Sequence, residues 1–416
     1  MTEPGPHFAP HLSDTELLDL VQRQTFRFFW ELAHPISGLA RDRSSDPRDV
    51  VTVGGSGFGI MAIIIASERG WITRDEALTR IMRMVAFLEG ATAYHGVFPH
   101  FMNGTNGETV PFGPLDDGGD LVETSFLMTG LLTARQYFSR DDNPEATLRA
   151  KIQALWDRVE WDWHTRGQTC LTWHWSPNHG WAMNHRIRGW NECLITYVLA
   201  ASAPRHRIAP AVYHEGWAQS GAIRNGECYY GIELPLGPQL GGPLFFAHYS
   251  FLGLDPRGLK DRYADYWQQN VNHTLINRAY CLENPKRCHG YGETCWGLTA
   301  SDNSTGYSAH APTNDHCVIT PTAALSSIPY CPDLSLCVLR HFYTSLGDRI
   351  WSAYGFTDAF SEKENWYSHD HLAIDQGPIV IMIENYRSAL VWRLFMSCPE
   401  IEDGLRRLGF ESPNIL

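Results

Sequence analysis

Four acidic side chains fall within eight positions of the chain: Asp116, Asp117, Asp120 and Glu123. The Gly-Gly pair at 118–119 allows a sharp backbone turn between them. If a helix begins near Asp120, this residue can cap it, and Glu123 then falls at the third helical position. Capping does not explain Asp116 or Asp117, which precede the turn. Crowded carboxyls raise one another's pKa, so the cluster suits an acid–base site or a site that binds sugar hydroxyls.

Glu192 lies at the start of an apolar segment, next to Trp190 and with no basic residue four positions later. Burial beside an indole ring raises the pKa of a carboxyl, which suits a general acid near neutral pH. The positive end of a helix acts in the opposite direction, because it favours the anion. The alternative interpretation is therefore a first-turn glutamate stabilised by the helix dipole.

Asp375 precedes Pro378, a residue that suits the first turn of a helix expected over 378–395. The positive end of that helix would keep the Asp375 carboxyl ionised, as a general base requires. A plain helix cap is the alternative role for Asp375.

No cofactor or metal is expected. His369, Asp370 and His371 superficially resemble metal ligands, but alternate positions without a third anchored ligand are a weak signal. The sequence contains no Walker loop, no dinucleotide-binding glycine motif after a strand and no HExxH motif.

Helical patterns dominate the elements that must position these acids. Capping boxes at 13–16 and 73–76 open two of about a dozen expected helices. Many of these helices are apolar on more than one face, which predicts an all-α, double-layered helical toroid. Long loops rich in Gly, Pro, Asn and aromatic residues lie between the helices, and loops this long are usually functional. They cover 91–120, 164–189, 218–243 and 281–317, with short hairpins expected at 168–175 and 227–234.

The chain of 416 residues is expected to form one domain over 13–416, after a flexible tail at 1–12. The formal charge of −13 argues against a nucleic-acid partner. No apolar run is long enough to span a membrane. Because no secretory signal is evident, a cytoplasmic protein is expected, or a periplasmic or secreted one if a leader was removed. A monomer or homodimer is expected.

The role of the aromatic residues and the state of the cysteines, thiol or disulfide, stay open. Aromatic residues make up 12% of the chain and include 15 Trp; they fit either a ring-rich core or the stacking of sugar rings. Cys281, Cys288 and Cys295 recur every seven residues, so a disulfide there is conceivable, although thiols are the default expectation.

Several segments resemble the bacterial glycoamylase-type proteins, which include the β-1,2-glucan hydrolases of glycoside hydrolase family 144. The segments are 189–204 (GWNECLITYVLAASAP), 243–266, 296–302 with Gly306-Tyr307, and 373–387 (AIDQGPIVIMIENYR). The resemblance implies an (α/α)6 toroid that hydrolyses β-1,2-glucan with inversion. It places the acids of the family's site on Asp116, Glu123, Glu192 and Asp375.

The sequence context of each acid and the family resemblance together predict a role for each residue of the site. Glu192 is predicted to be the general acid and Asp375 the base, while Asp116 and Glu123 orient the sugar, with Asp116 the reserve base. The predicted sugar-binding residues, with Trp190 foremost as a subsite wall, are Trp190, Asp117, Asp120, His248, Tyr249, Trp296 and Tyr307.

Two other functions stay open. One is a sugar epimerase or polysaccharide lyase on the same toroid, with His248 and Tyr249 as its basic pair. The other is a non-catalytic glucan-binding protein. Endo or exo action and chain-length preference are likewise open.

Overall fold

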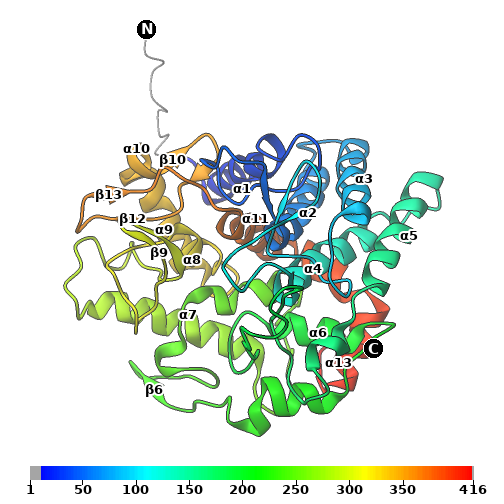
Figure 1. Cartoon of the computed structure of the whole chain (residues 1–416). Coiled ribbons are helices and arrows are strands. Elements are labelled where there is room, and N and C mark those ends of the chain that lie inside the picture. The colour runs from blue at the N-terminus through cyan, green and yellow to red at the C-terminus, as the bar shows by residue number, and fades with distance from the viewer. Residues whose placement is uncertain (1–10, 415–416) are drawn as a thin grey trace.

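A computed structural model describes residues 11–414 of the chain, and helices make up most of its regular structure (Figure 1). The helices are α1 (Asp14–Glu31), α2 (Val53–Glu68), α3 (Arg74–Gly90), α4 (Leu121–Tyr137), α5 (Asn143–Asp157), α6 (Leu194–Ser202), α7 (Tyr266–Glu283), α8 (Pro321–Leu325), α9 (Pro332–Ser345), α10 (Gly347–Ile350), α11 (Ala373–Ser388), α12 (Leu390–Met396) and α13 (Pro399–Arg407).

The strands are short and pair antiparallel within the loops. They are β1 (Val50–Thr52), β2 (Phe101–Asn103), β3 (Thr109–Val110), β4 (Gly119–Asp120), β5 (His174–Trp175), β6 (Cys228–Tyr229), β7 (Ile232–Glu233), β8 (Ala300–Asn303), β9 (Gly306–Ala309), β10 (Trp351–Ser352), β11 (Gly355–Phe356), β12 (Phe360–Ser361) and β13 (Trp366–Tyr367). The fold is therefore all-α with small accessory hairpins.

Helices buried on all sides alternate along the chain with helices buried on one face. α2, α4, α6, α8 and α11 are buried over nearly all of their circumference. α3, in contrast, buries only a stripe at helical spacing, formed by Ala77, Ile81, Met84, Val85 and Leu88. α2 packs against both α4 and α11, α4 contacts α6, and α8 contacts α11, so the fully buried helices neighbour one another.

Two glycines allow α2 and α4 to approach closely. A Cβ on Gly57 would lie 2.2 Å from the carbonyl oxygen of Phe126, and one on Gly130 would lie 2.2 Å from the carbonyl oxygen of Gly57. Only glycine fits at such a backbone contact. This contact fixes the spacing of the two helices whose N-terminal ends reach the candidate site.

Local start signals predicted several helices correctly. The capping boxes at Ser13 and Thr73 are formed, and Asp120 caps α4 by accepting hydrogen bonds from the backbone N–H groups of Val122 and Glu123. Glu123 is the third residue of α4, as expected.

The prediction of a helix over 378–395 is wrong at both ends of that segment. α11 begins at Ala373, because the N–H groups of Asp375 and Gln376 already bond to the carbonyl of Leu372, and Pro378 lies inside the helix. Ala389, with φ 55°, then separates α11 from α12. Residues 244–252 form two 3-10 segments, η5 (Leu244–Ala247) and η6 (Tyr249–Leu252).

The hairpin expected at 227–234 is formed by β6 and β7, but 168–175 does not pair with itself as expected. β5 pairs with β4 instead, with Asp120 opposite His174. This pairing joins the loop at 164–189 to the loop at 91–120, which carries the acidic cluster.

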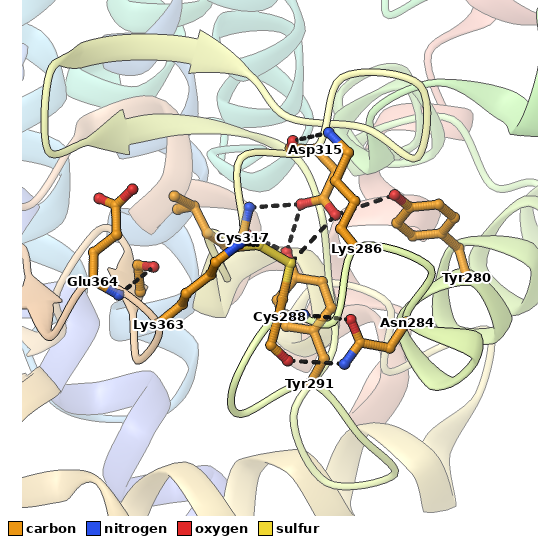
Figure 2. The surroundings of a disulfide bond; sticks show 11 residues. Tyr280, Asn284, Lys286, Cys288, Tyr291, Asp315, Cys317, Lys363 and Glu364 are labelled. Carbon is orange, nitrogen blue, oxygen red and sulfur yellow. Dashed lines mark hydrogen bonds between the residues drawn. A yellow bond between two sulfur atoms is a disulfide. The ribbon is translucent and has the colours of Figure 1, made fainter.

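Cys288 and Cys317 form a disulfide bond (Figure 2). The default expectation of thiols is therefore wrong for Cys288, whereas Cys281 and Cys295 are buried thiols. Beside the disulfide, the hydroxyls of Tyr280 and Tyr291 donate to the carboxylate of Asp315. The disulfide closes a loop that contains the β8–β9 hairpin.

Most of the expected tail at 1–12 lies outside the described residues. At its end, the carbonyl of Leu12 accepts a hydrogen bond from Arg340 at 3.0 Å. Within residues 11–414, none of the helices combines the length and the apolar character that crossing a membrane requires.

Candidate active site

A cavity of about 430 Å³ lies among the long loops and the N-terminal ends of α4 and α11. It is lined by Asp42, Arg43, Thr52, His100, Phe101, Phe112, Glu123, Phe126, Trp173, Glu192, Phe245, Tyr249, Ala300, Tyr307, Leu372 and Ile374. The cavity thus combines carboxyl groups with aromatic walls, as a site for a neutral sugar requires.

Glu192 lines this cavity just before α6, which starts at Leu194. The alternative of a first-turn glutamate is therefore not realised. The segment is fixed from η6, because Ser250 donates through its hydroxyl to the carbonyl of Glu192 and accepts from the N–H of Ile195 at 3.0 Å. Burial raises the pKa of Glu192 to about 7. The carboxyl can therefore hold a proton near neutral pH, as expected from its sequence context.

Glu123 reaches the cavity from α4 and accepts a hydrogen bond from the backbone N–H of Gly54 at 2.7 Å. Burial raises the pKa of Glu123 to about 7, although the nearby cation His100 favours its ionised form. Glu123 and Glu192 therefore bring two titratable carboxyls to the same cavity.

Asp120 lies fully buried behind the cavity wall and holds His100 and Trp173 in place. It accepts from the indole N–H of Trp173 at 2.8 Å, and its other oxygen lies 3.0 Å from Nδ1 of His100. Burial alone would lower the pKa of His100, but Glu123, Asp120 and Asp116 raise it to about 9. Asp120 has a lowered pKa despite its burial, because His100, His174 and the capped backbone N–H groups stabilise its charge.

Asp116 and Asp117 point to different surroundings. Asp116 is buried 3.4 Å from Nε2 of His174, and burial and the charge of Asp120 raise its pKa to about 6. Asp117 accepts hydrogen bonds from Ser176 and Asn178, which lower its pKa. Neither residue lines the cavity.

Asp375 is 1% exposed in the first turn of α11 and does not itself line the cavity, although its neighbours Leu372 and Ile374 do. The expectation that the helix end keeps it ionised is wrong. Burial and the adjacent carboxyl of Asp358 raise the pKa of Asp375 well above its ordinary value, and burial also raises that of Asp358, to about 7. Two buried carboxyls side by side share a proton.

A cluster of charges surrounds this carboxyl pair. Asp358 accepts from the backbone N–H of Asp302 at 2.8 Å, and Asp302 lies 3.2 Å from the guanidinium of Arg43. Arg43 also lies 3.2 Å from Asp370 and 3.6 Å from Asp42. The sequence analysis missed Arg43, Asp42, Asp302 and Asp358, because the contacts that join Arg43 to Asp302 and Asp370 are between residues far apart along the chain.

The aromatic walls differ from those expected. Tyr249 and Tyr307 line the cavity, as do five Phe and Trp rings that the sequence analysis did not single out: Phe101, Phe112, Phe126, Trp173 and Phe245. Tyr307 is 52% exposed, and Phe112 is exposed as well, so these rings offer surfaces for contact with a sugar.

Three predicted binding residues are packed in the core. Trp190 is 4% exposed and packs against Phe251 and Tyr266. Trp296 is fully buried in a separate apolar cluster. His248 is buried and bonded to Ser327 at 2.9 Å. The structure therefore does not bring these three side chains to the cavity, because apolar packing decides where their rings point.

Tyr249 lies on the cavity wall near three of the candidate acids. Burial raises the pKa of Tyr249 far above its ordinary value, and the charges of Asp375, Glu192 and Glu123 raise it further. Its phenol thus lies within the electrostatic reach of all three acids. A phenol held protonated in this way donates hydrogen bonds and is a poor base.

One set of side chains near the site has metal-ligand types: Asp116, Asp120 and His174, whose ligand atoms lie within 4.8 Å of one another. Asp120 already accepts hydrogen bonds from Trp173 and from two backbone N–H groups. Its oxygens are thus used in positioning the wall of the cavity.

Known proteins resemble the chain along nearly its whole length. The endo-β-1,2-glucanase of Chitinophaga pinensis, solved as a sophorotriose and glucose complex, is 54% identical, with a TM-score of 0.95 over 97% of this chain and 100% of that one. An exo-β-1,2-glucooligosaccharide sophorohydrolase of Parabacteroides distasonis is 46% identical over 95% of this chain, which spans only 58% of that relative.

A solved structure with much lower sequence identity shows similarity in fold alone. An endo-β-1,2-glucanase of Talaromyces funiculosus is 12% identical but superposes with a TM-score of 0.70 over 98% of this chain and 92% of that one.

The Glycoamylase family model matches residues 184–399, a segment that includes Glu192, Tyr249 and Asp375. From this match and the full-length likeness to the Chitinophaga protein, the chain belongs to the Glycoamylase family.

Proposed function

We propose that the protein hydrolyses β-1,2-glucosidic bonds of β-1,2-glucan or its oligosaccharides. The observation that carries this proposal is Glu192, a carboxyl with a pKa of about 7 on the wall of an aromatic cavity. The names of the relatives from Chitinophaga and Parabacteroides support the choice of linkage.

In the proposed reaction, Glu192 gives its proton to the leaving glycosidic oxygen as the bond to the anomeric carbon breaks. Asp375 accepts a proton from the water that attacks the same carbon from the opposite face. Inversion by this route requires carboxyls about 6.5–9.5 Å apart, to leave room for the water. Because burial and Asp358 raise the pKa of Asp375, Asp375 serves as the base only after it has lost its own proton.

The remaining predicted residues fill supporting roles. Glu123 and Tyr249 line the cavity, where a carboxyl and a phenol can bind sugar hydroxyls, and Tyr307 supplies a ring for stacking. Asp120 positions Trp173 through the indole hydrogen bond. Asp116, next to His174, is the reserve candidate for the base.

We also propose that the fold is an (α/α)6 toroid whose long loops gather at one end. The inner layer would consist of α2, α4, α6, the η5–η6 segment, α8 and α11, which are buried on nearly all sides and contact one another. The helices between them, buried on one face, would form the outer layer.

Endo action is the mode we propose. The chain is 54% identical to the Chitinophaga protein named as an endo enzyme and 46% identical to the Parabacteroides protein named as an exo enzyme. The Cys288–Cys317 disulfide supports a place of action outside the reducing cytosol.

The epimerase or lyase alternative is less well supported. Its proposed bases were His248 and Tyr249, but His248 is buried against Ser327 and the raised pKa of Tyr249 makes it a poor base.

The deciding experiment incubates the protein with β-1,2-glucan and follows three readouts. New reducing ends with the anomeric configuration inverted in NMR spectra would support the proposal. Absorbance from an unsaturated sugar would instead show a lyase. Retention of glucan without cleavage would show a binding protein.

A further inference from the structure

A second aromatic pocket lies outside the candidate active site. It has a volume of about 520 Å³ and is lined by Glu160, Asp162, Trp163, Arg166, Gly167, Trp181 and His206. None of these residues lines the cavity that contains Glu192. Its walls come from the segment that follows α5, from the loop at 164–189 and from His206, which follows α6.

Two indole rings form the apolar part of this pocket. Trp163 is 39% exposed and is held from one side by the ring of His95, whose centroid is 4.0 Å away at an interplanar angle of 15°. Trp181 lies 6.1 Å from Trp163 at 39°. Arg166 lies 5.3 Å from the centroid of the Trp181 ring, which holds that ring from another side. The rings are therefore fixed in place but still reach solvent.

The rim of the pocket carries both signs of charge. Glu160 pairs with His95 at 2.8 Å, Asp162 lies 3.4 Å from His206, and Arg166 donates to Asn184 at 2.7 Å. Because Glu160, Asp162 and Arg166 each have a polar partner, the rim offers hydrogen-bond donors and acceptors that are held in place. A neutral ligand with many hydroxyls and an apolar ring face fits this combination best.

Aromatic rings connect the pocket to the active-site cavity. Trp173 lines the cavity, and Trp175 follows two residues later in β5, about 7 Å further along the strand. The ring of Trp175 lies 6.5 Å from Trp163 and 5.3 Å from His95. A chain molecule bound in the cavity can therefore continue over Trp175 to Trp163 and Trp181.

We propose that this pocket, named here the Trp163–Trp181 pocket, is a second glucan-binding site that holds the part of a β-1,2-glucan chain outside the cavity. The identity of the ligand rests on the proposed function. The site would favour long chains over short ones, because a trisaccharide that occupies the cavity does not extend to it.

The test compares Trp163→Ala and Trp181→Ala with Tyr386→Ala. Tyr386 is a matched control, since it is an aromatic side chain 40% exposed that lines neither the pocket nor the cavity. For each variant, kcat/KM is measured on long β-1,2-glucan and on sophorotriose, and the ratio of the two is compared with that of the unmodified protein. Each substitution is also placed in a Glu192→Gln background, and retention is measured by electrophoresis in gels that contain β-1,2-glucan.

We expect the ratio to fall about tenfold for Trp163→Ala, as the loss of one good stacking contact predicts, and to recover in part for Trp163→Phe. Gel retention should weaken in parallel, and Tyr386→Ala should change neither readout. Unchanged ratio and retention in both Trp variants would overturn the second site. An equal loss on both substrates would also overturn it, because Trp163 would then support the active site or the fold. If the unmodified protein cleaved neither substrate, the proposed function would fail, and gel retention would still decide whether this pocket binds glucan.

Discussion

The backbone N–H of Gly54 donates to the carboxylate of Glu123 at 2.7 Å, and this bond joins α2 to α4 at the wall of the cavity. A Cβ on Gly54 would lie 2.6 Å from that carboxylate, so the bond depends on glycine. The position of an acid in the candidate active site is thus set by how closely two buried helices approach.

Gly57→Ala tests that approach. Its Cβ would lie 2.2 Å from the carbonyl oxygen of Phe126, so α2 and α4 must separate. We expect the free energy of unfolding to fall by about 3 kcal/mol, measured by urea denaturation. The control is Gly90→Ala at the end of α3, where an added Cβ would have nothing within 4 Å. An equal loss in both variants would contradict the close-contact explanation.

Glu192 should set the alkaline side of the pH–rate profile. Its pKa is raised to about 7, and a general acid must hold its proton, so kcat/KM on β-1,2-glucan should not be limited by Glu192 below that pH and should fall above it. Glu192→Gln should reduce the rate at least ~10²-fold. An aryl glycoside with an activated leaving group needs little protonation and should partly restore the rate. A variant with near-normal activity on glucan would show that another group is the acid.

Asp375→Asn should also reduce the rate at least ~10²-fold, but an activated leaving group should not restore it, because the attack of water still needs a base. The comparison with Glu192→Gln on the same two substrates separates the two roles. Equal restoration of both variants would mean that the acid and the base are assigned wrongly.

The substitution Asp358→Asn tests whether the carboxyl of Asp358 controls the protonation of Asp375. The carboxyl of Asp358 raises the pKa of Asp375, so its removal should lower that pKa and move the acidic side of the pH–rate profile to lower pH. A purely structural role for Asp358 would reduce the rate at all pH values without moving the profile. The full profile, measured from acid to neutral pH, is therefore the readout.

His100 should stabilise the fold in a pH-dependent way. Its pKa in the folded protein is about 9, raised by Glu123, Asp120 and Asp116 against the opposing effect of burial, while that of an unfolded histidine is about 6.5. The folded state thus binds the proton more tightly, and this stabilisation is complete below pH ~6.5 and is lost as the pH rises through about 9.

The measurement for His100 is the difference in unfolding free energy between the unmodified protein and His100→Gln. We expect this difference to shrink as the pH rises from about 6.5 to about 9. His179→Gln, at an exposed position, is the control and should show no such trend. A difference that stays constant with pH would contradict an ion pair between His100 and Asp120.

The disulfide should stabilise the loop that carries Tyr307. Cys288 and Cys317 are 29 residues apart, and closing a loop of that length contributes about 3–4 kcal/mol in the chain-entropy description. The double substitution Cys288→Ser with Cys317→Ser should lower the unfolding free energy by a comparable amount. Cys337→Ser, at an exposed thiol, is the control.

Local signals predicted several helix caps and the surroundings of three acids. Asp120 and Glu123 were recognisable because a cap and its third helical residue are close in the sequence. Glu192 was recognisable because its apolar neighbours along the chain also bury it in the fold.

Other features depend on contacts between distant residues, so the sequence alone could not predict them. The raised pKa of Asp375 depends on Asp358, which precedes β12 in the chain and approaches α11 only in the folded protein. Trp173 and Trp190 lie in similar polar surroundings in the sequence, yet one lines the cavity and the other packs in the core. Which way a ring points is decided by the packing around it.

The Cys288–Cys317 bond also changes the covalent topology of the chain. Residues 288–317 form a ring, so a single proteolytic cut inside it leaves the two parts of the protein joined. A chain nicked there would migrate as one species on a non-reducing gel and as two after reduction. The wall of the cavity that contains Tyr307 therefore stays attached to the protein even after its loop has been cut.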